Sequence, residues 1–88
     1  MEDQNALKVK NVAGNIRKVR AYRDYTQDYL AAKLNISQNA YSKIELGYSK
    51  ITIDRLFEIA QILEIDPVAL ISLEQTELIK ISSDPIKS

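Results

Sequence analysis

The segment SQNAYSKIELG, residues 37–47, carries side chains that can form directed hydrogen bonds with a planar partner. Gln38 and Ser42 lie four residues apart. Asn39 and Lys43 have the same spacing, so in a helix all four side chains would share one surface strip. An amide can pair with adenine through two hydrogen bonds, and an amine can donate to guanine acceptors or to phosphate. The strip is suited to reading base edges, although an isolated amphipathic helix also has a polar, solvated side.

The composition lacks the residues on which most catalytic and metal sites depend. The chain of 88 residues has no cysteine, no histidine and two glycines. It therefore lacks thiolate zinc ligands, the commonest general base, the commonest metal ligand and the material for a glycine-rich phosphate loop. No nucleophile and base stand at a recognisable spacing either. We predict that the protein is not an enzyme and uses no catalytic residue, metal or cofactor.

Length and hydropathy predict one small soluble domain. Apolar residues make up 45% of the chain and charged residues 27%, an ordinary balance for a globular protein. No apolar run is long enough to span a bilayer, and no basic-then-apolar signal peptide opens the chain. Together with the absence of cysteine, these features favour a cytoplasmic protein without a membrane partner.

The formal net charge of zero is an average over unlike segments. Residues 8–50 contain nine Lys or Arg and three Asp or Glu, a local charge of +6. Residues 51–88 contain three basic and seven acidic residues, which gives −4, and residues 1–7 add −2. The basic half favours an anionic partner, although a solvated surface with both signs explains the charges equally well.

The spacing of apolar residues predicts the first element that positions the strip. Val12, Ile16 and Val19 recur at i, i+4 and i+7, so we expect a helix from about residue 12 or 14 to residue 22. Residues 1–11 are polar with a short alternation. We expect them to form a flexible N-terminal arm.

Capping residues delimit the next two helices. Thr26 and Ser37 can each begin a helix as an N-cap, because their hydroxyl oxygens can accept a free backbone N–H. Asn35 can end the earlier helix because asparagine tolerates the left-handed conformation. Gly47 ends the later one. The polar strip thus lies on a short helix of its own.

The second half of the chain predicts two more helices. Thr52 can cap a fourth helix that is apolar over more than one stripe, and Asp66 followed by Pro67 is a strong start signal for a short fifth helix. The result is an all-α domain of five helices over residues 12–73. The C-terminal tail, residues 74–88, alternates imperfectly and is either a brief strand or frayed.

The segment TQDYLAAKLNISQNAYSKIE, residues 26–45, has the pattern of a helix-turn-helix. Its two helices are joined by Asn35 and Ile36, and the small Ala31 lies where two helices must approach closely. Over about residues 14–71 the chain resembles the phage repressor and Cro class, also called the Xre-like family. The resemblance rests on Thr26, Gln27, Leu30, Ala31, Lys33, Leu34, Ile36, Ser37, Ser42, Lys43, Ile44, Glu45, Gly47, Leu56, Ile59, Ala60, Leu63, Ile65, Asp66 and Pro67.

This resemblance implies a compact five-helix repressor-like domain and a transcriptional regulator that binds double-stranded DNA sequence-specifically. The chain departs from the family pattern at three positions, none of which disables the motif. Asn35 replaces the usual glycine, Tyr41 replaces a β-branched aliphatic residue, and Ile51 stands where proline is common. The core beneath the third helix must therefore admit the ring of Tyr41.

The resemblance also implies roles for individual residues. It pairs Arg20 with Glu45 in a structural ion pair that joins the first helix to the end of the third. The base contacts that it implies are Gln38, Asn39, Ser42 and Lys43. It places a phosphate contact at Gln27, where free N–H groups begin a helix. The further phosphate contacts that we expect around the groove are Tyr48, Ser49 and Lys50. Arg17 could add an electrostatic contact to phosphate, although a solvated face of the first helix explains its charge better.

The sequence allows two kinds of partner besides DNA. The apolar surplus in the last two helices favours a homodimer that reads two half-sites, with an interface expected at Phe57, Ile62, Val68, Leu70 and Ile71. Each of these residues taken singly also suits an ordinary core. The alternative function is a protein-binding module, such as an antitoxin whose tail, residues 74–88, covers a partner protein.

Overall fold

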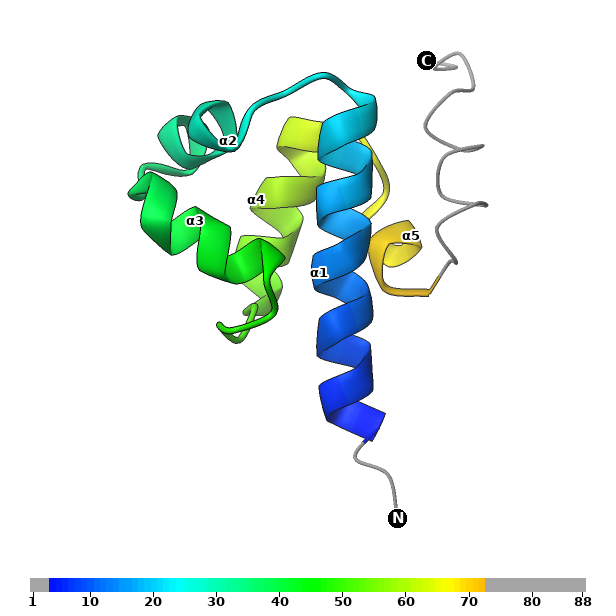
Figure 1. Ribbon diagram of the computed structural model, residues 1–88. Coiled ribbons are helices and arrows are strands. Elements are labelled where there is room, and N and C mark those ends of the chain that lie inside the picture. Colours follow the sequence, from blue (N-terminus) through cyan, green and yellow to red (C-terminus); the bar gives the residue numbers. More distant parts are fainter. Residues whose placement is uncertain (1–3, 73–88) are drawn as a thin grey trace.

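Five helices surround one apolar core in the computed structural model, which describes residues 4–72, with side chains from residue 12 onward (Figure 1). All regular secondary structure in this range is helical, in agreement with the predicted all-α fold. The tail that was predicted at residues 74–88 lies outside the described residues. The helices are α1 Gln4–Tyr22, α2 Gln27–Leu34, α3 Gln38–Glu45, α4 Ile53–Leu63 and α5 Pro67–Ser72.

The first helix is longer than the sequence predicted. It begins at Gln4 rather than near Val12, so the prediction of a flexible arm is wrong for residues 4–11. This stretch, QNALKVKN, contains one glutamine, one alanine, one leucine and two lysines, all of which are good helix formers. Their propensity continues the helix backwards beyond the apolar stripe from which its start was inferred.

Each of the other helices begins at the predicted cap. The side-chain oxygen of the cap accepts a hydrogen bond from a backbone N–H in the first turn, which satisfies one of the otherwise unpaired donors there. The donor–acceptor distances are 3.0 Å from Tyr29 to Thr26, 3.0 Å from Ala40 to Ser37, 3.1 Å from Arg55 to Thr52 and 2.9 Å from Val68 to Asp66.

Three non-glycine residues adopt the left-handed conformation between helices. Asn35 does so at φ 60°, as predicted, and ends α2. Glu64 ends α4 at φ 59°, and Asp24 follows α1 at φ 63°. Glutamate carries no sequence signal for such a cap. The end of α4 is instead supported from outside, because Arg23 donates to the carbonyl oxygens of Leu63 and Glu64 at 2.8 and 3.0 Å.

The core is built by one face of every helix. In Figure 1, α1 stands at the centre, with α2 and α3 on one side and α5 on the other. The helix α1 contacts α3, α4 and α5, whereas α2 contacts α3 and α4. No helix within residues 4–72 is long and apolar enough to cross a membrane. The large side chains that are fully buried are Ile16, Val19, Leu30, Tyr41, Ile59, Leu63 and Leu70.

Candidate nucleic-acid-binding surface

The helix α3 has one buried face and one polar face. Tyr41 and Ile44 point into the core, with exposed fractions of 0% and 6%. On the opposite side, the side chains of Gln38, Asn39 and Lys43 are exposed, and that of Ser42 is half-buried. The four residues predicted to contact bases therefore lie on the accessible side of a two-turn helix whose other side is packed.

The turn between α2 and α3 holds the two helices close together. Ala31 is buried at their contact, where a larger side chain would separate them. Asn35 reverses the chain, and the half-buried Ile36 packs against the core. The N–H of Ile36 donates to the carbonyl of Ala31 at 3.0 Å. These contacts fix the angle at which α3 leaves α2 and thus the direction of its polar face.

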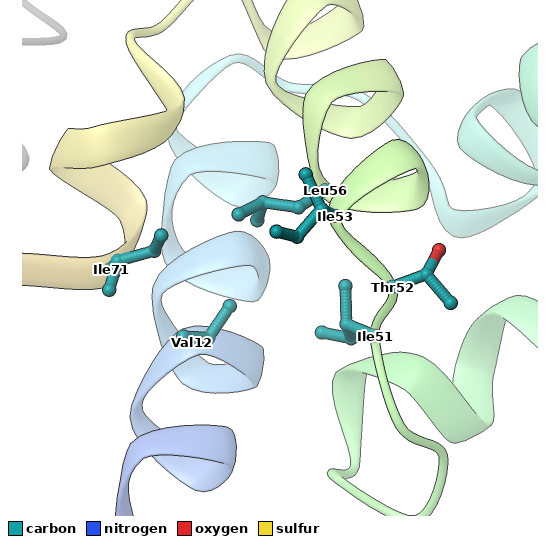
Figure 2. A pocket seen from close by; sticks show the side chains of 6 residues that line it. All are labelled: Val12, Ile51, Thr52, Ile53, Leu56 and Ile71. Atoms are coloured by element: carbon teal, nitrogen blue, oxygen red, sulfur yellow. The ribbon is translucent and has the colours of Figure 1, made fainter.

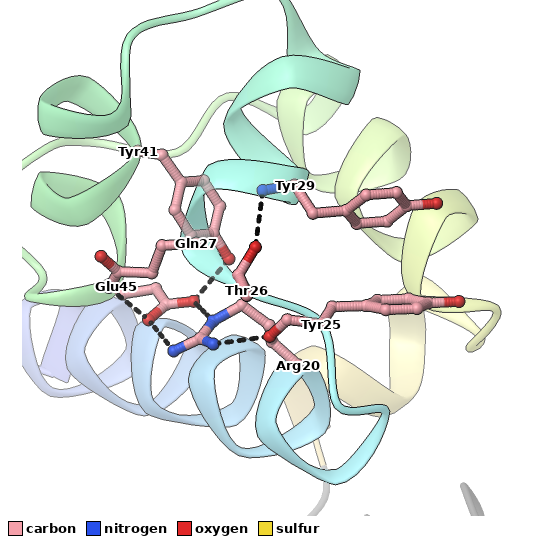
Figure 3. A network of polar contacts seen from close by, with 7 residues as sticks. All are labelled: Arg20, Tyr25, Thr26, Gln27, Tyr29, Tyr41 and Glu45. Carbon is pink, nitrogen blue, oxygen red and sulfur yellow. Dashed lines mark hydrogen bonds and ion pairs between the residues drawn. The ribbon is translucent and has the colours of Figure 1, made fainter.

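A buried carboxylate ties α3 to the two preceding helices (Figure 3). The side chain of Glu45 is 1% exposed, and Arg20 of α1 contacts both of its oxygens, with Nε 2.5 Å from Oε2 and Nη2 3.1 Å from Oε1. Gln27 of α2 donates from Nε2 to Oε1 at 3.1 Å, and the Tyr41 hydroxyl donates to Oε2 at 2.5 Å. The Nη1 atom of Arg20 donates to the carbonyl of Tyr25 at 2.8 Å. Arg20 and Glu45 thus stand together as the ion pair that the sequence implied.

The protonation states in this network agree with its hydrogen bonds. Burial acts to raise the pKa of Glu45, but hydrogen bonds from Arg20, Tyr41 and Gln27 outweigh it, and the net pKa lies below the ordinary value. The hydrogen bond to Glu45 raises the pKa of Arg20. Burial first, and then the hydrogen bond to Glu45, raise the pKa of Tyr41. At neutral pH, Glu45 is therefore an anionic acceptor and Tyr41 a protonated donor.

Four of the residues predicted to contact phosphate lie at the two ends of the pair formed by α2 and α3, and the fifth lies on α1. Gln27 is the first residue of α2 and is half-buried, with one amide hydrogen donated to Glu45. Tyr48 and Lys50 are exposed, and Ser49 is half-buried, in the loop after α3. Arg17 is exposed one turn before the ion-paired arginine of α1. Gln27 thus differs from the others because its side chain already has a protein partner.

Two polar contacts within the scaffold were missed from the sequence. Asn15 is 3% exposed, and its Nδ2 donates to the carbonyl of Leu70 at 2.7 Å, at the end of the short α5. Arg23 donates to the carbonyl oxygens of Leu63 and Glu64 at the end of α4. Both contacts join residues that are 40 or more positions apart. No local pattern signals them.

The predicted dimer interface is partly wrong. Phe57, Val68 and Ile71 are exposed, at 56%, 62% and 47%. Leu70, however, is fully buried between α1 and α4, so its side chain belongs to the core. Ile62 lies five residues after Phe57, which is roughly 140° around the helix at 3.6 residues per turn, and it packs against the core on another side of α4.

Four exposed apolar residues lie on α4 and α5, and one of them was not singled out in the sequence. Ile53 begins α4 and is 72% exposed, one turn before Phe57. Ile71 stands across a cleft from Ile53, and Val68 lies one turn before Ile71 on α5. These four residues are called the α4–α5 apolar surface below. The cleft measures about 210 Å³ and is lined by Val12, Ile51, Thr52, Ile53, Leu56 and Ile71 (Figure 2).

Comparison with known proteins agrees with this arrangement. The model of the family described as helix-turn-helix, of the Xre-like class, matches residues 16–70, more than half of the chain. The match begins within α1, includes α2, α3 and α4, and ends within α5. Comparison with curated proteins and with solved structures finds no match.

Proposed function

The chain belongs to the Xre-like helix-turn-helix family of DNA-binding regulators, and we propose that it is a sequence-specific repressor or controller that acts as a homodimer. It would occupy a promoter and exclude other proteins sterically. The observation that carries this proposal is the polar face of α3, which is exposed while the rest of the helix is held by packing and by the Glu45 network.

The side chains on this face have the chemistry that major-groove reading requires. Gln38 and Asn39 can each pair with adenine through two hydrogen bonds, and Lys43 can donate to guanine. Ser42 can donate to or accept from either kind of base. A recognition helix contacts bases mainly through its N-terminal residues, and Gln38 and Asn39 begin α3. We propose these four residues as the base contacts.

Phosphate contacts would set the position of α3 in the groove. Gln27 begins α2, where free N–H groups favour an anion. The exposed Tyr48 and Lys50 and the half-buried Ser49 follow α3 in the chain. Arg17 adds an exposed positive charge on α1. The local charge of +6 over residues 8–50 supports attraction of this half of the protein to DNA.

The α4–α5 apolar surface supports self-association. A group of exposed large apolar side chains around a cleft is unfavourable in water and marks a contact surface. Two copies related by a two-fold axis would cover it and would place their recognition helices on half-sites about one helical turn apart. Phe57, Val68 and Ile71 remain in the proposed interface, and Ile53 joins them.

The proposal is tested by selecting bound sites from a random duplex pool at a stated salt concentration and then substituting Gln38. We expect Gln38→Ala to cost about 1–3 kcal/mol on the selected duplex and almost nothing on random DNA. Gln61→Ala, at an exposed position on α4, is the matched control and is expected to change neither affinity. Equal losses on selected and random duplexes would contradict base reading by α3.

A further inference from the structure

The carboxylate of Glu45 has two donors on each of its oxygens. Oε2 accepts from Arg20 Nε and from the Tyr41 hydroxyl, and Oε1 accepts from Arg20 Nη2 and from Gln27 Nε2. These donors come from α1, α2 and α3, so one buried group links the start of α2 to the middle of α3 (Figure 3). The orientation of this carboxylate therefore determines where Gln27 finds its acceptor.

The hydroxyl of Tyr41 restrains that orientation. The terminal torsion of a glutamate side chain is soft, because it joins a tetrahedral carbon to a planar group. Arg20 binds one edge of the carboxylate, and the hydroxyl adds a short bond to Oε2 from the same helix that carries Glu45. Phenylalanine at position 41 would fill the same space but would leave Oε2 with one donor fewer, so the carboxylate would be held by Arg20 and Gln27 alone.

Gln27 is a member of the network that reaches the surface. It is half-buried at the start of α2, and its Nε2 carries two hydrogens, one of which is donated to Oε1 of Glu45. A carboxylate only accepts hydrogen bonds, so only the NH₂ end of the amide can face it. A phosphate oxygen also only accepts. In this orientation the second hydrogen can serve a phosphate, whereas a reversed amide would present its own oxygen to it.

We propose that Tyr41 is a positioning residue for DNA binding, whose hydroxyl holds the Glu45 carboxylate so that the amide of Gln27 donates its second hydrogen to a DNA phosphate. This inference rests on the proposed function, because it assigns a task within the same surface. Tyr41 is fully buried and acts on DNA only through the other two residues. The contact carries no sequence information, since it is made to the phosphate backbone.

The test compares wild type with Tyr41→Phe on the selected duplex and on random DNA, at a temperature where circular dichroism shows both proteins fully folded. We expect Tyr41→Phe to weaken binding about tenfold on both duplexes, because a phosphate contact is lost. Tyr29→Phe, at a 41% exposed tyrosine, is the matched control and is expected to bind as wild type does. A purely structural role for Tyr41 would lower the melting temperature but leave the affinity of the folded protein unchanged, and that result would overturn the proposal.

A double-mutant cycle tests whether Gln27 carries the effect. In a Gln27→Ala background, Tyr41→Phe is expected to weaken binding less than about twofold, because the amide that it positions is absent. A full tenfold loss in that background would overturn the proposal. If the wild type selects no site at all, the proposed function itself is wrong. If it selects a site that Tyr41→Phe binds equally well, only the inference about Tyr41 fails.

A measurement on the wild type alone keeps the proposal testable if Tyr41→Phe does not fold. We expect nuclear magnetic resonance to show two distinct side-chain amide hydrogens for Gln27, one of them protected from exchange by Glu45. Adding the selected duplex should shift the other hydrogen and leave the protected one in place. Equal exchange of both hydrogens, or no shift of either on binding, would overturn the proposal.

Discussion

The two halves of the molecule that pack on α1 are held by different means. On one side, α3 is joined to α1 by the buried ion pair of Arg20 and Glu45, and Gln27 of α2 also donates a hydrogen bond to Glu45. On the other side, α5 is held by apolar packing and by the hydrogen bond from Asn15 to the carbonyl of Leu70. Hydrogen bonds are directional and apolar contacts are not. The half that must hold α3 at one angle is the half with the polar network.

The surfaces of the two halves also differ in polarity. The α2–α3 half presents amides, a hydroxyl and an amine, which suit a hydrogen-bonding partner such as DNA. The α4 and α5 half presents the α4–α5 apolar surface, which suits a second copy of the chain. The proposed DNA contacts and the proposed self-association surface therefore lie on different halves of the molecule. The following substitutions test this division, from the largest expected loss of fold stability to the smallest.

The largest effect is expected from Glu45→Ala. Removing one partner of a buried ion pair leaves the other charge without compensation, and we expect a loss of about 3–5 kcal/mol in the free energy of unfolding. Chemical denaturation measures it. The control is Glu58→Ala, which breaks the surface pair between Arg55 and Glu58 at 3.0 Å, where Glu58 is 57% exposed. That loss should stay below about 1 kcal/mol. Similar losses in both variants would contradict the structural role of the network.

A smaller loss is expected from Asn15→Ala in the other half. This change leaves the buried carbonyl of Leu70 without the donor that Asn15 supplies, at a cost of about 1–3 kcal/mol. Asn39→Ala makes the same chemical change at an exposed site, and its effect on stability should be within about 0.5 kcal/mol. If Asn15→Ala destabilised the fold more than Glu45→Ala does, the polar network would not be the stronger link.

Acid should weaken the α2–α3 half through Glu45. Its pKa is lowered on folding, so the unfolded chain binds this proton more tightly than the folded chain. The stabilisation is fully present above the unfolded pKa of about 4.3 and is lost as the pH falls through the lower folded pKa. Denaturation of the wild type at several pH values should show this decline below about pH 4.3. Glu45→Gln should lack that part of the slope, and an identical slope in both proteins would contradict the lowered pKa.

The smallest effect on the fold is expected from Phe57→Asp. The side chain is 56% exposed, so the helical content of the single chain should be retained. Self-association should be lost, since a charge would be buried in the apolar contact, and sedimentation equilibrium at micromolar concentration measures this. Tyr22→Asp, at a 43% exposed aromatic residue outside the α4–α5 apolar surface, should leave association intact. A wild type that is strictly monomeric would remove the proposed dimer.

The helix boundaries could be predicted wherever a local signal exists. Thr26, Ser37 and Thr52 act as caps, as their sequence contexts indicate, because an N-cap bond spans only three residues. The start of α1 was wrong, because the prediction followed an apolar stripe that begins only at Val12. The helix propensity of the preceding residues extends α1 toward the N-terminus, beyond the residues that form the buried stripe.

The side chains of the candidate site were less predictable than the helix that bears them. The exposed positions on α3 follow from its period, and these residues remain proposed base contacts. The hydroxyl bond of Tyr41 and the amide bond of Gln27 did not follow, because both depend on where Glu45 lies in three dimensions. Leu70 was misplaced for a related reason, since an apolar residue on a short helix suits a core and an interface equally well.

The sequence by itself determined that this protein folds as five helices with a helix-turn-helix at residues 26–45, because caps, apolar periods and the turn at Asn35 are local features. Only the tertiary structure decided that Glu45 gathers donors from three helices, that Asn15 reaches Leu70, and that Ile53 of α4 and Ile71 of α5 line one cleft. Contacts between distant residues depend on how the helices pack, and the period of a single helix records which face is buried but not what lies against it.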